Sequence, residues 1–265
     1  MYLHAADSRP SISHNGLILD ALAAGGTELA FQPILHSGPN PRVGFFEGLA
    51  RLRLQQGQLL LPGAFIPVLE GAGRETQLDR YVLRNALSTL ADHPRMRLSV
   101  NVGLTTLSDP AWLNLLQREV ADRPHLTDRL IVELTERAVD DPDLTIPFTR
   151  TVRAMGVSVV LDDFGAGHTA FRQFRDLALD GVKIDGFFSR NIENDRDNQC
   201  LVTALVGIAR HFEMFTVAEF VETPEQAQCL SDLGVDFLQG HLFAPARPKP
   251  DWIIAPVSTS TRSTG

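Results

Sequence analysis

The chain has 265 residues, 44% of them hydrophobic, and its 24 basic and 32 acidic residues give a net charge of −8. This length suits one α/β barrel, and the negative charge argues against polymeric nucleic acid as a partner, because a phosphate backbone is repelled. No apolar run reaches the ~18 residues of a membrane-spanning helix, and residues 1–15 lack the basic start and apolar centre of a signal peptide. We therefore expect a cytoplasmic protein, with Cys200 and Cys229 as ordinary buried thiols outside any CxxC motif.

Strands and helices are predicted from the spacing of apolar residues and from capping residues. In the first half we expect an irregular segment over 1–14, a helix over 16–24, strands over 29–36 and 43–51, a loop over 55–61, helices over 62–69 and 77–91, a strand over 97–102, and a helix over 109–121. Asp109 is expected to cap that last helix, with Pro110 in its first turn.

The second half alternates regularly between the two kinds of element. We expect strands over 130–135, 157–161, 181–184, 215–218 and 235–238, and helices over 141–155, 169–177, 197–212 and 224–233. The Ser/Thr-rich segment 251–265 is predicted to be a flexible tail, so the folded domain spans 15–250.

Eight strands, six of them separated by helices, favour a modified (β/α)8 TIM-like barrel of the α/β class. The first two strands are joined by the short turn HSGPNP, which is too short for a helical crossover. We therefore expect the first strand to run antiparallel to the second.

Polar residues stand at or near the C-terminal ends of seven of these strands. They are Glu47, Asn101, Glu133, Asp162 with Asp163, Lys183, Glu219 and Gln239. The C-terminal ends of parallel barrel strands share one mouth, so these side chains are expected to meet there. Desolvating so many carboxylates is costly, and divalent cations would offset that cost, which indicates a catalytic site.

The adjacent pair Asp162 and Asp163 suits a two-metal site, because one carboxylate can bridge two cations while the other binds one of them. A strand end followed by a capping aspartate is the alternative. Strand alternation places Glu133 on the same face as Ile131 and Thr135, pointing into the barrel. Glu136 is expected to brace a neighbouring loop or to be solvated.

Lys183 lies in an apolar strand and must pair with an acidic group, either in the mouth or with Asp185 at an exposed edge. Asn101, between two valines, is either a ligand for a hard cation or a hydrogen-bonded core residue. Gln32 is a polar residue in an apolar strand, and Arg51 shares a strand face with Glu47, so both are candidates for substrate contact.

Eight ordered segments together resemble one family, the EAL-domain cyclic di-GMP phosphodiesterases, over about residues 17–247. They are FQPI at 31–34, FEGLAR at 46–51, SVNVG at 99–103, VELTE at 132–136, LDDFGAG at 161–167, VKID at 182–185, VAEFVET at 217–223 and LQGHLF at 238–243. The resemblance implies a modified barrel that hydrolyses cyclic di-GMP to linear pGpG with two Mg²⁺ or Mn²⁺ ions. It also implies a homodimer.

The same resemblance implies roles for individual residues. The ligands of the first cation would be Glu47, Asn101, Glu133 and Asp162, and those of the second Asp162, Asp163 and Glu219. Catalytic roles would fall to Glu47, Glu219, Lys183, which would position the attacking water, and Glu136, which would brace the loop after Asp163. Substrate would be bound by Gln32, Arg51, Gln239 and Glu222.

The chain departs from the usual family pattern at three places. Gly48 replaces the signature alanine, Ala166 and His168 alter the loop after Asp163, and Phe220 replaces a glycine beside Glu219. Two alternative functions stay open: a catalytically inactive cyclic di-GMP receptor, and a metal-dependent aldolase or isomerase on a conventional barrel. The first would be expected to lack metal ligands, and the second to carry a phosphate-binding loop after the last two strands.

Overall fold

The structure, a computed structural model, describes residues 14–165 and 175–248. Its strands are β1 Thr27–His36, β2 Val43–Arg53, β3 Leu59–Leu60, β4 Leu98–Val102, β5 Leu130–Thr135, β6 Ser158–Phe164, β7 Gly181–Ile184, β8 Phe215–Ala218 and β9 Phe237–Leu238. Its α-helices are α1 His14–Ala23, α2 Pro62–Gly71, α3 Glu75–Asp92, α4 Pro110–Asp122, α5 Pro142–Ala154, α6 Gly186–Ser189, α7 Arg196–His211 and α8 Pro224–Asp232. Short 3₁₀ segments are η1 Leu104–Ser108, η2 Pro124–Arg129 and η3 Glu136–Asp140.

The strands form one sheet in the order β1-β9-β8-β7-β6-β5-β4-β2-β3, and a further pairing between β1 and β2 closes it into a barrel. β1 runs antiparallel to both β2 and β9, while the neighbours from β2 through β4 to β9 pair in parallel. The predicted (β/α)8 architecture and the antiparallel first strand are therefore confirmed. β3 only extends the edge of β2.

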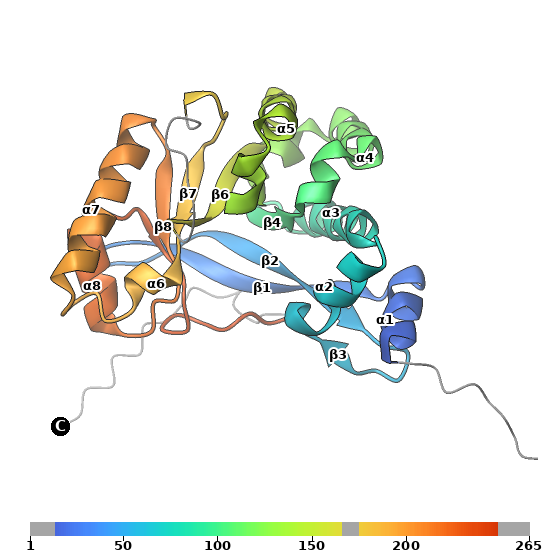
Figure 1. The fold of residues 1–265 in the computed structure, drawn as a ribbon, viewed down its shortest axis with the longest axis horizontal. Coiled ribbons are helices and arrows are strands. Elements are labelled where there is room, and N and C mark those ends of the chain that lie inside the picture. Colours follow the sequence, from blue (N-terminus) through green and yellow to red (C-terminus); the bar gives the residue numbers. More distant parts are fainter. Residues whose placement is uncertain (1–13, 166–174, 249–265) are drawn as a thin grey trace, which may run out of the picture.

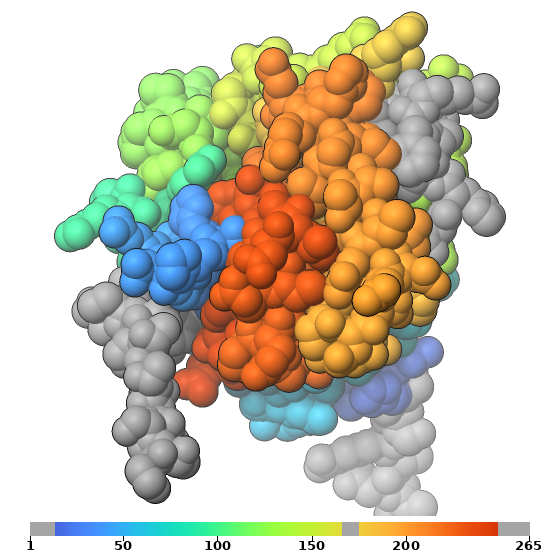
Figure 2. Space-filling model, turned by 90° about the vertical axis from the view of Figure 1, so that its left-hand side faces the viewer, coloured from blue at the N-terminus to red at the C-terminus, as the bar shows by residue number. Residues whose placement is uncertain are grey.

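Helices cover the outside of the barrel (Figure 1). α3, α4 and α5 lie on one flank of the strands, and α7 and α8 lie on the other. Figure 2 shows the second flank, where the turn between β1 and β2 lies beside α8. In this contact the Gly38 N–H donates to Ser231 Oγ of α8 at 3.2 Å, and the neighbouring Ser37 N–H donates to the carbonyl of Asp236, just before β9, at 2.9 Å. Residues two hundred positions apart thus close the barrel.

The helix starts follow the expected capping chemistry. Asp109 accepts a hydrogen bond from the Ala111 N–H at 3.0 Å, which confirms it as the cap of α4. Thr223 and Gln226 form a reciprocal capping box at the start of α8. Because these ends are fixed locally, the predicted and observed helix boundaries differ by only a residue or two in most places.

Three details differ from expectation, and a fourth expectation is not tested. β3 lies in the segment 55–61 expected as a loop. β6 continues to Phe164, so Asp162 and Asp163 belong to the strand rather than follow it, at an irregularity in the pairing with β7. Cys200 is exposed rather than buried, because it lies on the outer face of α7, and Cys229 is half-buried. Most of the helix expected over 169–177 lies outside the described residues.

The apolar core has two parts. The larger part fills the space between the barrel and the surrounding helices, where Trp112 and Phe148 pack with their ring centroids 5.5 Å apart. The smaller part fills the barrel interior and consists of Ile34, Phe45, Ile131, Val160 and Val217, with Phe215 and Phe237 against it. Within residues 14–165 and 175–248, no helix combines the length and the apolar character that crossing a bilayer requires.

Candidate active site at the barrel mouth

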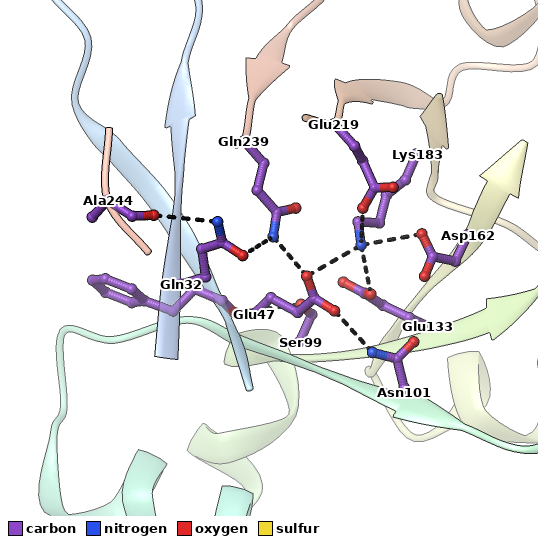
Figure 3. Close-up of polar contacts among 11 residues, drawn as sticks. Gln32, Glu47, Ser99, Asn101, Glu133, Asp162, Lys183, Glu219, Gln239 and Ala244 are labelled. Atoms are coloured by element: carbon purple, nitrogen blue, oxygen red, sulfur yellow. Dashed lines mark hydrogen bonds and ion pairs between the residues drawn. The ribbon is translucent and has the colours of Figure 1, made fainter. Parts of the chain in front are cut away.

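Strand pairing brings the predicted polar residues together above the inner apolar core. Asn101 of β4 lies opposite Glu133 of β5, and Asp162 of β6 lies opposite Thr135. On the antiparallel side, Gln32 of β1 lies opposite Glu47 of β2. The side chains from these strands converge in one cluster (Figure 3). The strand register alone therefore accounts for the meeting of residues far apart in sequence.

Lys183 lies at the centre of this cluster, with its side chain 1% exposed. Its Nζ lies near one oxygen of each of four carboxylates: 2.7 Å from Glu219, 3.0 Å from Glu133, 3.1 Å from Asp162 and 3.3 Å from Glu47. Burial acts to lower the pKa of Lys183, but the surrounding carboxylates, Asp162 foremost, raise it well above its ordinary value. The ammonium group therefore stays charged.

The alternative in which Lys183 pairs with Asp185 at an exposed edge is wrong. The Asp185 carboxylate instead accepts a hydrogen bond from the Phe187 N–H at 2.8 Å and caps the short helix α6. Lys183 points inward because residues 181 and 183 alternate with the outward-facing Val182 on β7.

One lysine does not balance the negative charge around it. Burial raises the pKa of Glu133 well above its ordinary value despite Lys183, and burial raises the pKa of Glu219 to about 8. Burial also acts to raise the pKa of Glu47, but Lys183 and hydrogen bonds from Gln239 and Asn101 hold it below its ordinary value. The cluster thus gains free energy from additional positive charge, whether from protons or from cations.

Two side-chain amides bind Glu47 directly, and a third amide extends the network to a backbone carbonyl. The Asn101 Nδ2 group donates to Glu47 Oε1 at 2.9 Å, and the Gln239 Nε2 group donates to Glu47 Oε2 at 2.6 Å and to Gln32 Oε1 at 3.2 Å. Gln32 in turn donates from Nε2 to the Ala244 carbonyl at 3.2 Å. Asn101 therefore meets a mouth carboxylate rather than a core carbonyl, and the network joins four predicted site residues, Gln32, Glu47, Asn101 and Gln239.

A cation could be held by the acidic group Asp162, Asp163 and Glu219, which offer carboxylate oxygens within 4.8 Å of one another. These are hard oxygen donors of the kind that Mg²⁺ and Mn²⁺ prefer. Asp163 adopts a left-handed backbone with φ of 59°, which aspartate tolerates better than most residues. Glu133 Oε1 is buried and has no hydrogen-bond partner among the described residues, so it is available to a further cation. The donor set fits divalent ions.

A cavity of about 440 Å³ adjoins the cluster. The four predicted substrate-binding residues Gln32, Arg51, Glu222 and Gln239 all line it, together with Glu47 and Glu219. Arg51 is 8% exposed, and burial lowers its pKa although Glu47 acts in the opposite direction. An arginine keeps its charge under such a shift. The cavity therefore combines acidic groups for cations with a guanidinium group for an anion.

Glu136 takes a different position. It begins η3 and lines a second cavity of about 780 Å³ together with Asp163. Most of the loop after Asp163 that it is expected to brace, including the two departures Ala166 and His168, lies outside the described residues.

The sequence prediction missed one buried acidic group, Asp79 of α3. Its Oδ2 atom accepts hydrogen bonds from the Gly103 N–H at 2.9 Å and the Thr106 hydroxyl at 2.6 Å. Burial raises the pKa of Asp79 to about 6, against the effect of these two hydrogen bonds. Asp79 lies four residues before the buried Leu83, on the same face of α3, and this spacing could have predicted its burial. Asp79 holds the loop that follows Asn101.

Comparison with known proteins gives a consistent result. The sequence profile described as "EAL domain" matches residues 17–246. Over 229 residues the chain is 34% identical to the cyclic di-GMP phosphodiesterase NbdA of Pseudomonas aeruginosa, covering 84% of this chain and 29% of NbdA. It is 31% identical to the probable cyclic di-GMP phosphodiesterase PdeB of Escherichia coli, covering 84% of this chain and 43% of PdeB. The chain thus spans less than half the length of these relatives.

Solved structures share the fold. The PaMucR phosphodiesterase in complex with c-di-GMP superimposes with a TM-score of 0.78 and 29% sequence identity, covering 87% of this chain and 96% of that one.

Proposed function

We propose that this chain, which belongs to the EAL domain family, is a metal-dependent phosphodiesterase that hydrolyses one phosphodiester bond of cyclic di-GMP to give linear pGpG. The observation that carries the proposal is the convergence of Glu47, Glu133, Asp162 and Glu219 on Lys183 within 2.7–3.3 Å. The naming of relatives and of a structural neighbour as cyclic di-GMP phosphodiesterases supports the choice of substrate.

Two divalent cations, Mg²⁺ or Mn²⁺, would be held at the mouth. One would be bound by Glu47, Asn101, Glu133 and Asp162, and the other by Asp162, Asp163 and Glu219. When bound, such ions lower the pKa of a coordinated water and neutralise charge on the phosphate oxygens. The support is the fit of the donor set: hard oxygens, a surplus of buried negative charge and the unpartnered Glu133 Oε1.

The protein's own groups would do the positioning. The Lys183 ammonium, kept charged by its four carboxylates, would donate a hydrogen bond to the attacking water and hold it in line with the scissile bond. Arg51 would bind a phosphate oxygen from the wall of the 440 Å³ cavity, and Gln32, Gln239 and Glu222 would contact the nucleotide there. Glu136 would act at a distance, through the loop that follows Asp163.

The inactive-receptor alternative is not favoured. A receptor has no need of a complete set of cation ligands, yet each residue expected to bind a cation is present and close to its neighbours. The aldolase or isomerase alternative needs a phosphate-binding loop near Gly240. That glycine instead packs against the Val221 backbone, where an added Cβ would come within 2.0 Å of a carbonyl oxygen.

The test is to incubate the purified chain with cyclic di-GMP in Mg²⁺, Mn²⁺ or EDTA and to separate the products by chromatography. We expect pGpG in one or both metal ions and intact substrate in EDTA. Tight binding of cyclic di-GMP without any product in either metal would instead identify a receptor.

A homodimer is also proposed, on the strength of the family resemblance. Sedimentation velocity would give twice the 29.1 kDa of one chain if it forms, and the mass of one chain if it does not.

A further inference from the structure

The residues from Glu219 to Thr223 connect β8 to α8 and form one side of the 440 Å³ cavity. Glu219 and Glu222 both line this cavity, and Glu222 is exposed to it. Within residues 14–165 and 175–248, the Glu222 carboxylate takes part in no hydrogen bond or ion pair. The position of this carboxylate in the cavity therefore depends on how the backbone of the connecting segment is held.

Backbone contacts hold the first part of this segment. The Glu219 N–H donates to the Ile184 carbonyl of β7 at 3.3 Å, and the Val221 N–H donates to the Gln239 carbonyl at 3.0 Å. Val221 is buried and packs closely on Gly240, where an added Cβ would lie 2.0 Å from the Val221 carbonyl oxygen. These contacts fix the chain as far as Val221.

Gln226 of α8 holds the remaining part of the segment. Its Oε1 atom accepts hydrogen bonds from the Glu222 N–H at 2.8 Å and from the Thr223 N–H at 3.2 Å. The bond from Thr223 belongs to the capping box, in which Thr223 Oγ1 accepts from the Gln226 N–H at 3.2 Å. A capping box requires only the bond to the N-cap residue. The bond to Glu222 is additional, and because Gln226 is 7% exposed, solvent competes little for it.

We infer that Gln226 is a positioning residue for substrate binding, which holds the Glu222 backbone so that the Glu222 carboxylate faces the cavity. An ionised carboxylate only accepts hydrogen bonds, so Glu222 suits the N–H groups of a guanine base. The inference rests on the proposed function for the identity of the ligand, cyclic di-GMP. Gln226 is not among the residues that line the cavity, so its contribution to substrate affinity is exerted through Glu222.

The inference is tested by steady-state hydrolysis of cyclic di-GMP with substitutions at both positions. Gln226→Met keeps the side-chain length but removes the accepting oxygen, and KM should rise roughly 3- to 10-fold, the loss that one hydrogen bond supports, while kcat changes less than about twofold. Gln226→Glu keeps an oxygen acceptor and should preserve KM within about twofold. In a Glu222→Ala background, Gln226→Met should have no further effect on KM, because the group through which it acts is gone.

The matched control is Thr223→Ala, which removes the other half of the capping box and leaves the bond from the Glu222 N–H to Gln226 in place. Thr223→Ala should lower the melting temperature about as much as Gln226→Met does, because an N-cap is lost, but it should leave KM unchanged. An equal rise in KM with Thr223→Ala would show that the capping of α8, rather than the positioning of Glu222, sets substrate affinity, and would overturn the inference.

Two further results would overturn the inference: a wild-type KM for Gln226→Met, and an undiminished rise in KM when Gln226→Met is added to Glu222→Ala. Circular dichroism melting identifies a variant that does not fold, and Gln226→Ala replaces Gln226→Met in both backgrounds if that variant fails. A wild-type protein that binds cyclic di-GMP but releases no pGpG contradicts only the proposed function, and the affinities of the same variants, measured by calorimetry, then decide the inference. A wild type that neither binds nor cleaves cyclic di-GMP overturns both.

Discussion

The interior of the barrel has two layers built on the same strands, with opposite composition. The floor is the apolar cluster Ile34, Phe45, Ile131, Val160 and Val217. Two residues away along the same chain segments lie five residues of the mouth, which are Gln32, Glu47, Glu133, Asp162 and, directly after β8, Glu219. Residues two apart on a strand share one face, so a single step along the inward face changes the interior from hydrocarbon to charge.

The direction of each strand decides whether the polar mouth residue comes before or after the apolar floor residue in the sequence. On the parallel strands the charged residue follows the apolar one, whereas on the antiparallel β1 Gln32 precedes Ile34. On β7 the floor position is Gly181, and the Phe215 ring fills its space, with ring atoms 2.6 Å from where a Cβ would lie. The floor excludes water from below, which is why burial raises the pKa values of Glu133 and Glu219. The floor residues that stabilise the fold and the mouth residues proposed to act on substrate are therefore adjacent, but each set can be altered without the other.

The largest effect is expected from a change in the mouth alone. Asp162→Asn removes a carboxylate proposed to contact both cations, and kcat/KM should fall roughly 10³-fold, equivalent to about 4 kcal/mol of transition-state stabilisation. The free energy of unfolding in EDTA should not fall, because the substitution removes one negative charge from a cluster with too many. Product release and urea denaturation measure the two quantities.

The matched control for that substitution is Asp128→Asn, an isosteric change at an exposed position of η2, which should leave both quantities unchanged. Retention of more than a tenth of the wild-type kcat/KM by Asp162→Asn would show that the mouth is not the reaction site.

A change in the floor should produce the converse pattern. The Phe45 ring packs against Phe215 and Phe237, with centroid separations of 6.0 and 5.5 Å. Phe45→Ala should lower the free energy of unfolding by about 3–5 kcal/mol through the cavity it leaves. The folded fraction should keep far more activity than Asp162→Asn does. Urea denaturation followed by circular dichroism measures the loss.

Phe187→Ala provides the comparison, because Phe187 is 65% exposed on α6 and its loss should change stability by less than about 0.5 kcal/mol. Equal destabilisation by the two substitutions would refute the role of the floor.

The smallest effect concerns Asp79, a carboxylate outside both layers that supports the loop after Asn101. Its pKa is raised to about 6 in the folded protein from an ordinary value of 3.8, so the folded state binds this proton more tightly than the unfolded state. The contribution of this proton to the free energy of unfolding is fully present below about pH 4 and is lost as the pH rises through about 6. Relative to Asp79→Asn, the wild type should therefore lose about 2–3 kcal/mol over this interval.

Denaturation of both proteins between pH 4 and 7.5 in EDTA isolates this contribution, since the other titrating groups are common to the two. Curves that stay parallel across the interval would show that Asp79 does not titrate there.

Much of the fold could be predicted because its signals are local. Asp109 caps α4 through a hydrogen bond to a residue two positions away, and the short turn before Val43 forces β1 antiparallel to β2. Elements without periodicity were missed: β3 has two residues, α6 has four, and the 3₁₀ segments have five or six. Such short pieces are set by tertiary packing rather than by their own sequence.

The candidate site could be predicted only in part from the sequence. Strand alternation placed Glu133 in the barrel, whereas for Lys183 the sequence left both the mouth and an exposed edge open. The meeting of the two side chains follows from parallel strand pairing. The bend at Asp163 and the left-handed backbone of Phe220 were not predictable, because each depends on contacts with other strands and loops. Asp79 was missed because a charged residue in a helix is ordinarily solvated, whereas here a loop 24 residues later covers it.

The most direct test of the account is anomalous diffraction from crystals of the protein grown with Mn²⁺ and the product pGpG, since cyclic di-GMP itself would be hydrolysed. We predict Mn²⁺ peaks at coordination distance, roughly 2 Å, from Asp162, with one peak shared by Asp163 and Glu219 and the other by Glu47 and Glu133. Ordered pGpG in the cavity with no Mn²⁺ peak between these carboxylates would contradict the claim that the mouth holds divalent cations.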